Sequence, residues 1–417
     1  MTADPTPWLD AWVPRSLLQL PAAEPVPGAT AEGLTAVRLR WRDGRLLMPE
    51  PLSQQQAPPC QLVLPRLVDP HVHLDKAFTW SAHPNLSGTY SGALAANLEE
   101  HQQRTQTAVL ERAERALQLG CSRGLRAVRS HIDSLGPGAE ASWQALLELR
   151  DRWRDRLTLQ LVALVPIDHW STPDGATLAR RVAAAGGLLG GVLVPPCRGA
   201  TVRQSLRGML RLAQQLGCGI DLHIDEADRA PAAGLRQLLY VLERERPPLP
   251  ITCSHASSLG LLADRPLQRI CRRMAASDLR VAALPLTNGW LLARRPGRTP
   301  VLRPLAPIHQ LQRAGVCVAV GGDNVADPWF PAGGFDPIAL MASSLPLAQL
   351  APWQRLGLAP FTTAAAALMD LAWDGVIREG APADLMLLEA SSWSEALMSP
   401  PARQILIAGH WWRPPTR

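Results

Sequence analysis

Arg66-Leu-Val-Asp-Pro-His71-Val-His73 decides the fold, because here a short apolar run ends directly in two histidines. Residues two apart on an extended strand point to the same side, so both imidazoles can reach one point at the end of that strand. A His-x-His pair alone is a weak signal. The interpretation therefore depends on whether other polar motifs follow strand-like runs in the same way.

Apolar runs and helical stretches alternate along most of the chain. The runs cover residues 66–68, 125–128, 157–165, 188–194, 219–222, 250–253, 279–284 and 316–320. The amphipathic stretches between them cover residues 107–119, 140–153, 201–216, 233–242, 266–276 and 308–314. Eight strand and helix units in series predict an α/β fold, a (β/α)8 TIM barrel, with its active site at the carboxyl ends of the strands.

Polar side chains follow four of these runs. They are His71, His73, His223, His255 and Asp323. The chain holds only ten histidines, so four of them at predicted strand ends form a specific pattern. A catalytic Zn²⁺ or Fe²⁺ takes imidazole and carboxylate ligands and keeps one position open. We therefore predict that His71, His73, His223 and Asp323 bind a divalent metal, zinc or iron.

The composition is that of an ordered globular protein. The chain has 417 residues, of which 47% are hydrophobic and 19% charged. This length suits one large barrel with a small accessory domain. The formal charge is +6, but the arginines are scattered without a basic block, so we expect no nucleic-acid partner.

The seven cysteines include no Cys-x-x-Cys pair and mostly lie in apolar segments, which indicates reduced core residues. The N-terminal residues show no basic and apolar signal-peptide pattern, and no run of about 18 apolar residues occurs. We therefore expect a cytoplasmic enzyme with no membrane partner. A homo-oligomer remains open.

Both chain ends read as strands of a second domain. Residues 35–41 alternate apolar and charged side chains, and Asp43-Gly44 turns the chain into residues 45–48, as in a β-hairpin. Strand-like runs also occur at residues 61–64, 380–388 and 404–410. We predict a small β-sandwich domain from residues 1–64 and 373–417, around a barrel domain of residues 65–372.

Lys76 is the only lysine in the chain and lies three residues after His73. A lysine offers a compact ammonium that a planar guanidinium does not mimic. Lys76 is therefore a candidate substrate-binding residue. The alternative is a salt bridge to Asp75 or to another carboxylate.

With these motifs the chain resembles the amidohydrolase superfamily, in particular the branch of cytosine deaminases and N-isopropylammelide hydrolases. The resemblance covers about residues 60–390. It rests on Val68-Asp-Pro-His-Val-His-Leu-Asp-Lys-Ala-Phe-Thr79, Arg129-Ser-His-Ile-Asp133, Asp221-Leu-His-Ile-Asp-Glu226, Ser254-His255 and Gly322-Asp-Asn-Val-Ala-Asp-Pro-Trp329.

The resemblance implies roles for single residues. The ligand set named above would hold one ion, because binuclear members usually carry a lysine or glutamate after the fourth strand and Gly191-Val-Leu-Val-Pro-Pro196 offers neither. Glu226 would shuttle protons and His255 would contact the reactive water. His131 and Asp133 are expected to support the ligands rather than to bind the metal.

A mechanism follows from the same residues. A bound divalent metal lowers the pKa of water to about 7 and supplies hydroxide for attack on an electron-poor ring carbon. Asp323 could take the water proton, while Glu226 could protonate the ring nitrogen and then the departing amine as general acid/base. His255 would orient the nucleophile or stabilise developing charge.

Two departures from cytosine deaminases concern the substrate. Those enzymes typically have Pro-Gln-Glu after the third strand, where this chain has Pro166-Ile167-Asp168, and an isoleucine cannot form the hydrogen bonds of that glutamine. After the last aspartate this chain has Asn324, which can donate as well as accept. Ile167 and Asn324 are thus the other two predicted substrate-binding residues.

We predict a metal-dependent hydrolytic deaminase of a small heterocyclic amine, cytosine-deaminase-like, that releases ammonia or an amine from a cyclic amidine. One alternative is a cyclic amide hydrolase of the hydantoinase or dihydroorotase kind, whose relatives normally need two metals. The other is a non-catalytic, metal-stabilised binding homologue. The substrate, cytosine or a triazine or another cyclic amidine, and the metal's identity are left open.

Overall fold

A computed structural model describes residues 6–20, 29–53, 55–245, 247–399 and 401–413, so the N-terminal residues 1–5 lie outside it. The chain divides into two compact units. One comprises Met1–Val68, Gln118–Arg126 and Phe335–Arg417, and the other Asp69–Leu117 and Ala127–Gly334. This division groups residues 335–372 with the terminal segments, whereas the sequence analysis assigns them to the barrel. Within the described residues, every helix is too short or too polar to cross a bilayer.

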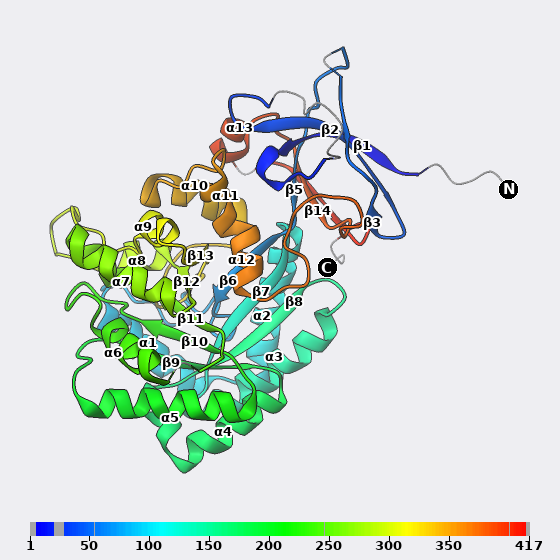
Figure 1. The fold of residues 1–417 in the computed structure, drawn as a ribbon. Helices are drawn as coiled ribbons and strands as arrows, with labels where there is room; N and C mark the ends of the chain where they lie inside the picture. Colours follow the sequence, from blue (N-terminus) through cyan, green and yellow to red (C-terminus); the bar gives the residue numbers. More distant parts are fainter. Residues whose placement is uncertain (1–5, 21–28, 54, 246, 400, 414–417) are drawn as a thin grey trace. The chain divides into compact units, whose positions relative to one another are not determined.

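The predicted TIM barrel is confirmed (Figure 1). Its sheet follows chain order from β6 to β13. The strands are β6 Leu67–Val72, β7 Leu125–Asp133, β8 Thr158–Leu164, β9 Leu188–Leu193, β10 Ile220–Ile224, β11 Ile251–His255, β12 Leu279–Ala283 and β13 Cys317–Val320. A parallel bridge between Val72 and Asp323 joins the ends of the first and last strands. Asp323 is thereby brought beside the two histidines of the first motif.

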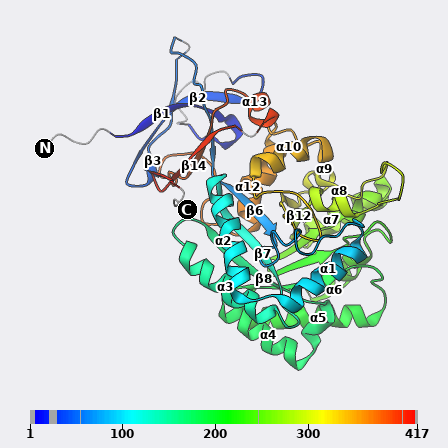
Figure 2. The same ribbon diagram turned by 180° about the vertical axis from the view of Figure 1, so that it is seen from behind.

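Helices surround the barrel strands (Figure 1), and seen from behind α2 and α3 flank β7 and β8 (Figure 2). They are α1 Tyr90–Gln103, α2 Gln106–Ser122, α3 Ala139–Trp153, α4 Pro173–Ala184, α5 Ala200–Leu216, α6 Ala233–Glu245, α7 Asp264–Ala276, α8 Pro285–Leu291 and α9 Ile308–Arg313. Short 3-10 helices lie at Ile167–Ser171 and Ser257–Leu261. Local sequence sets their ends: Thr172 caps α4 by accepting from Gly175 N, and Gly217, with φ +67°, ends α5.

Several barrel strands extend further than their apolar runs. β6 continues through His71, and β10 and β11 include His223 and His255. All residues of these three strands are buried, so polar side chains continue the ladder instead of ending it. The histidines are therefore held by strand hydrogen bonds as well as by side-chain contacts.

The predicted second sheet from both chain ends is also present. Its order is β16-β15-β14-β5-β1-β2-β3, with β4 beside β2. The strands are β1 Trp8–Pro14, β2 Leu34–Arg42, β3 Arg45–Leu46, β4 Glu50–Pro51, β5 Leu62–Pro65, β14 Leu385–Leu388, β15 Arg403–Ile407 and β16 His410–Trp411. The helices of this unit are Arg15–Leu17 (3-10), α10 Pro337–Ala348, α11 Arg355–Leu358, Ala359–Phe361 (3-10), α12 Thr363–Leu368 and α13 Trp393–Met398. The predicted hairpin is confirmed as β2 and β3, and β1, which the sequence analysis missed, lies between it and β5.

Candidate active site

Three histidines and one aspartate converge at the carboxyl ends of β6, β10 and β13. His73 Nε2 lies 3.3 Å from Asp323 Oδ1 and 3.3 Å from His223 Nε2. His71 Nε2 lies 3.5 Å from the same Asp323 oxygen. All four side chains are buried. The structure thus brings together the complete predicted ligand set from three separate parts of the sequence.

The facing atoms of this cluster suit a cation. His71 Nε2 and both carboxylate oxygens of Asp323 are buried without a well-aligned hydrogen-bond partner among the described residues. A buried polar group left unsatisfied costs about 1–3 kcal/mol, and a metal ion would satisfy several at once. Imidazole and carboxylate donors are those preferred by zinc and non-haem iron. The residues present therefore fit a divalent metal.

A chain of buried hydrogen bonds fixes the tautomer of His71. Ser254 Oγ donates to Asp221 Oδ1 at 2.7 Å, and Asp221 Oδ2 also accepts from Arg129 at 2.8 Å. Since the serine hydrogen is used on Asp221, Ser254 Oγ accepts from His71 Nδ1 at 2.8 Å. The proton of His71 is then on Nδ1, which leaves the Nε2 lone pair facing Asp323.

Burial keeps His71 and His223 neutral. It lowers the pKa of His71 and His223 well below the usual histidine value, and neighbouring histidines lower it further. Burial alone would raise the pKa of Asp323, but contact with His73 and His255 brings it below its usual value. Neutral imidazoles beside an ionised carboxylate are the protonation states that bind a metal.

His131 packs directly on this cluster. Its ring stacks on His71 with a centroid distance of 3.8 Å and an interplanar angle of 25°. Burial lowers its pKa well below the usual value as well. Together with His71 and Asp221 it forms one of three groups among the described residues whose donor atoms lie within 4.8 Å of one another; the other two are His71 with His73 and Asp323, and His71 with His223 and His255. Its contact with His71 agrees with the predicted supporting role.

Glu226 and His255 lie beside the ligands. Glu226 Oε1 is 3.7 Å from His255 Nδ1. Asn288 Nδ2 donates to the same His255 nitrogen at 3.0 Å, so the ring proton is on Nε2, which is buried without a partner among the described residues. Burial, together with Asp323, raises the pKa of Glu226 well above the usual value. Glu226 can therefore hold a proton at neutral pH, and His255 can donate a hydrogen bond from Nε2.

Backbone turns aim these side chains. His255 and Asp323 adopt positive φ angles of 69° and 60°, an uncommon conformation outside glycine that is concentrated at functional sites. Asp225, before Glu226, also has a positive φ, and its carboxylate accepts from Gly234 N and Leu235 N at 2.8 Å each. The carboxylate thus caps the start of α6 and fixes the loop that carries Glu226.

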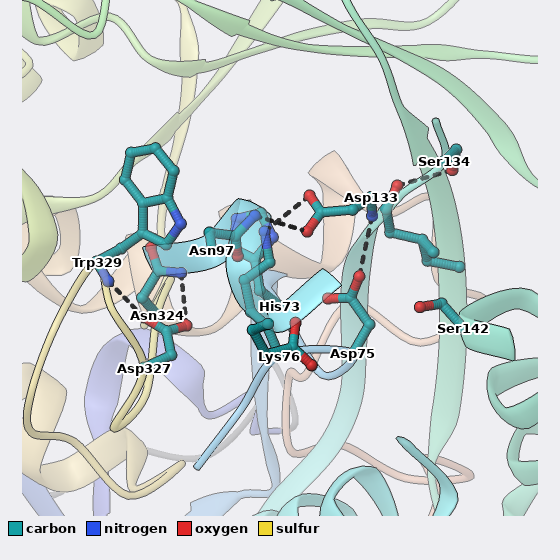
Figure 3. Close-up of polar contacts among 12 residues, drawn as sticks. His73, Asp75, Lys76, Asn97, Asp133, Ser134, Ser142, Asn324, Asp327 and Trp329 are labelled. Carbon is teal, nitrogen blue, oxygen red and sulfur yellow. Dashed lines mark hydrogen bonds and ion pairs between the residues drawn. The ribbon is translucent and has the colours of Figure 1, made fainter. Parts of the chain in front are cut away.

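His73, His223 and Asp323 of this cluster line a cavity of about 520 Å³. Lys76 lies on its polar side and donates from Nζ to Asp133 Oδ1 at 2.8 Å, while Asp133 Oδ2 accepts from Asn97 at 3.2 Å (Figure 3). Lys76 lowers the pKa of Asp133 far below its usual value, although burial opposes this. The salt-bridge interpretation of Lys76 is therefore confirmed. Lys76 also lines the cavity, and its contact with the substrate stays a prediction.

Asn324 also lines the cavity, and its orientation is set from behind (Figure 3). Its Nδ2 donates to Asp327 Oδ2 at 2.8 Å. The other oxygen of Asp327 accepts from Trp329 N and Phe330 N at 2.9 and 3.2 Å. Asp327 takes one of the two Nδ2 hydrogens, which fixes the orientation of the amide and leaves Oδ1 of Asn324 available as a hydrogen-bond acceptor.

Ile167 does not reach the cavity. Val165 and Pro166 line it, but Ile167 begins a 3-10 helix and its Cδ1 packs 3.0 Å from the point where a Cβ on Gly191 would lie. The side chain fills the space that this glycine leaves open. The prediction that Ile167 contacts the substrate is corrected on this ground.

Sequence reasoning missed some residues of the cavity. Asn288, which orients His255, lies in α8 outside any motif and left no signal. Tyr90 and Trp329 line the cavity and meet edge to face with ring centroids 4.9 Å apart. Trp329 is the last residue of the motif Gly322–Trp329, so the sequence did indicate that it lies near the site.

Comparison with known proteins agrees with this site. The profile of the Amidohydrolase family matches residues 174–409, more than half of the chain. A pterin deaminase from Rhizobium rhizogenes is 31% identical over 389 residues, covering 91% of this chain and 88% of the relative. The chain belongs to the amidohydrolase family.

More distant relatives share the fold. The N-isopropylammelide isopropyl amidohydrolase of Pseudomonas sp. is 24% identical, covering 83% of this chain and 84% of the relative. The crystal structure of 5-methylcytosine deaminase from Klebsiella pneumoniae with 5-fluorocytosine superposes with a TM-score of 0.80, at 24% identity and 97% coverage of both chains. The predicted resemblance to the deaminase and ammelide hydrolase branch is thereby confirmed.

Proposed function

We propose that this protein is a metal-dependent hydrolytic deaminase that removes an amino group from a nitrogen heterocycle. The observation that carries the proposal is the buried convergence of His71, His73, His223 and Asp323 beside Glu226 and His255. The most informative relative for the substrate is the pterin deaminase, because its similarity extends over 91% of this chain. Pterin is therefore the first substrate to test, before cytosine and the triazines that motif resemblance alone favours.

When bound to the ligand set, a divalent metal supplies a nucleophile at neutral pH by lowering the pKa of water to about 7. The chain's own residues move the protons. Asp323 accepts the proton of the attacking water. Glu226, protonated because of its burial, donates its proton to the ring nitrogen next to the attacked carbon. The resulting carboxylate takes the proton of the new C–OH group as the carbonyl forms and passes it to the leaving amine. The proton held by Asp323 then returns to Glu226, which restores both residues. His255 donates from Nε2 to the developing negative charge.

Two further residues hold the ring. Asn324 Oδ1 accepts a hydrogen from an N–H of the substrate, because donation from Nδ2 to Asp327 holds the amide in place and leaves its oxygen available. Lys76 has three ammonium hydrogens, and Asp133 takes one of them. Another can donate to a ring carbonyl oxygen. The site thus favours a ring that carries an N–H and a C=O in addition to the amino group that leaves.

Ammonia release from zinc- or iron-loaded protein tests the proposal. The panel contains pterin, cytosine, 5-methylcytosine and ammelide. It also contains N-isopropylammelide, for which the release of isopropylamine is measured instead of ammonia. We expect turnover of at least one ring by the wild type and its loss in Glu226→Gln. Glu243→Gln, a half-exposed surface change, serves as the matched control and should keep full activity. Ring opening of hydantoin or dihydroorotate without ammonia would contradict the proposal and favour the cyclic amide hydrolase.

A further inference from the structure

Helix α1 buries polar side chains and exposes leucines, which is the opposite of an ordinary amphipathic helix. Asn97, Glu100 and His101 are buried, whereas Leu94 and Leu98 are 43% and 55% exposed. A surface helix normally turns its leucines to the core and its polar residues to water. Large exposed apolar side chains paired with buried polar ones are the informative exception, and they mark surfaces that bind something.

Ion pairs hold α1 in place without its leucines. Glu100 accepts from Arg104 at 3.0 Å and from Arg112 at 2.7 Å. Arg104 also donates to Asp75 at 2.8 Å, in the segment that follows the first metal motif. The buried face of the helix is thus satisfied by charged partners. Leu94 and Leu98 are free of any anchoring role that would explain them.

Both leucines line the cavity that contains Glu226 and His255. Other apolar residues line the same cavity: Leu135, Leu164, Val165, Val192 and Val194. Leu135 is 51% exposed, so three half-exposed leucines gather in one cavity. Its volume of about 520 Å³ falls within the roughly 300–1,000 Å³ of pockets that enclose drug-sized ligands. The cavity therefore has room for more than the reacting ring.

We propose that this apolar wall is a subsite for a nonpolar aryl or alkyl substituent on the substrate ring, and that Leu98 is one of its specificity-determining residues. The inference rests on the proposed deaminase function and names its substrate class more closely. The substituent is on the part of the ring remote from the amino group that leaves, since Glu226 and the ligand set are buried whereas the three leucines are half-exposed and so border on solvent. Binding of the substituent removes exposed leucine surface from water.

The test compares pterin with 6-phenylpterin, and cytosine with 5-phenylcytosine, on metal-loaded wild type, Leu98→Gln and Leu302→Gln. Glutamine has nearly the helix propensity of leucine, so α1 should stay intact. Leu302 is the matched control, because it is 58% exposed and is not among the described residues that line this cavity. The readouts are kcat/KM from ammonia release and the Kd of each ring from calorimetry.

We expect the wild type to prefer the phenyl-substituted member of the pair it deaminates. Leu98→Gln should reduce that preference about tenfold, as expected for lost apolar contact in a pocket, because kcat/KM falls more for the phenyl-substituted ring than for the bare ring. An equal loss for both rings, or no wild-type preference, would overturn the subsite. Absence of turnover on every ring would refute the deaminase instead, and the two Kd values would then decide the subsite on their own.

Discussion

Ser254 offers a sharp test of the metal site, because its hydroxyl links His71 to Asp221 and Ser254 is not among the described residues that line the cavity. Ser254→Ala removes the acceptor of His71 Nδ1–H at 2.8 Å and the donor to Asp221 Oδ1 at 2.7 Å. Asp221 keeps Arg129, so the larger effect falls on His71. Loss of such a supporting partner typically costs 10–100-fold in metal affinity, or about 1.4–2.7 kcal/mol.

Zinc affinity measured by competition with a chromogenic chelator checks this prediction. Ser344→Ala is the matched control, since Ser344 is equally buried and donates to Leu340 O at 2.7 Å in the other unit. It should lower stability by about 1 kcal/mol and leave zinc affinity unchanged. The reasoning would be refuted if Ser254→Ala bound zinc as tightly as the wild type while remaining folded.

Three further changes test the walls of the cavity. Asp327→Asn frees the amide of Asn324 to rotate, because it removes the carboxylate that accepts from Nδ2. We expect KM for the preferred substrate ring to rise about tenfold with a smaller change in kcat. An unchanged KM would contradict the orientation assigned to the Asn324 amide. Lys76→Met leaves Asp133 without one of its cations, and thermal unfolding should show that the free energy of unfolding falls by about 1–3 kcal/mol. This is less than the cost of a wholly unpaired buried charge, because Arg104 and Asn97 still contact the Asp133 carboxylate. The pKa of Asp133 is depressed in the folded protein, so its charge stabilises the fold above the unfolded-state pKa of about 3.9, and this stabilisation is lost as the pH falls. The melting temperature of Asp133→Asn should therefore lie below that of the wild type by a constant amount from about pH 8 to 5, and the difference should shrink below about pH 4. A difference that stays constant at every pH would argue against the ion pair.

The barrel could be predicted because its strands are short apolar runs between helices of clear period. The ligands could be predicted because a strand places His71 and His73 on one side, and because the ends of parallel strands meet at one edge of the barrel. Helix α1 could not be found in this way. Its buried positions hold Asn97, Glu100 and His101, so it lacks the apolar periodicity on which helix prediction depends.

Other errors have a similar physical origin. Ile167 was placed in the pocket by its position after a strand, but packing toward Gly191 turns it away. Asn288 contacts His255 only through the fold, because 33 positions separate them in sequence. The hydrogen bond from Asn324 to Asp327 is local in sequence, yet the orientation that it gives the amide is visible only in the structure. Motifs therefore name the reactive groups, while their orientation comes from tertiary packing.

Isotope labelling tests the central claim most directly. The metal-loaded protein would be incubated in H₂¹⁸O with the ring that releases most ammonia, and the product analysed by mass spectrometry. Water attack at the amino-bearing carbon predicts one ¹⁸O in each product ring for the wild type and almost none for Glu226→Gln. Ammonia released without ¹⁸O in the ring, or full incorporation by Glu226→Gln, would contradict the account.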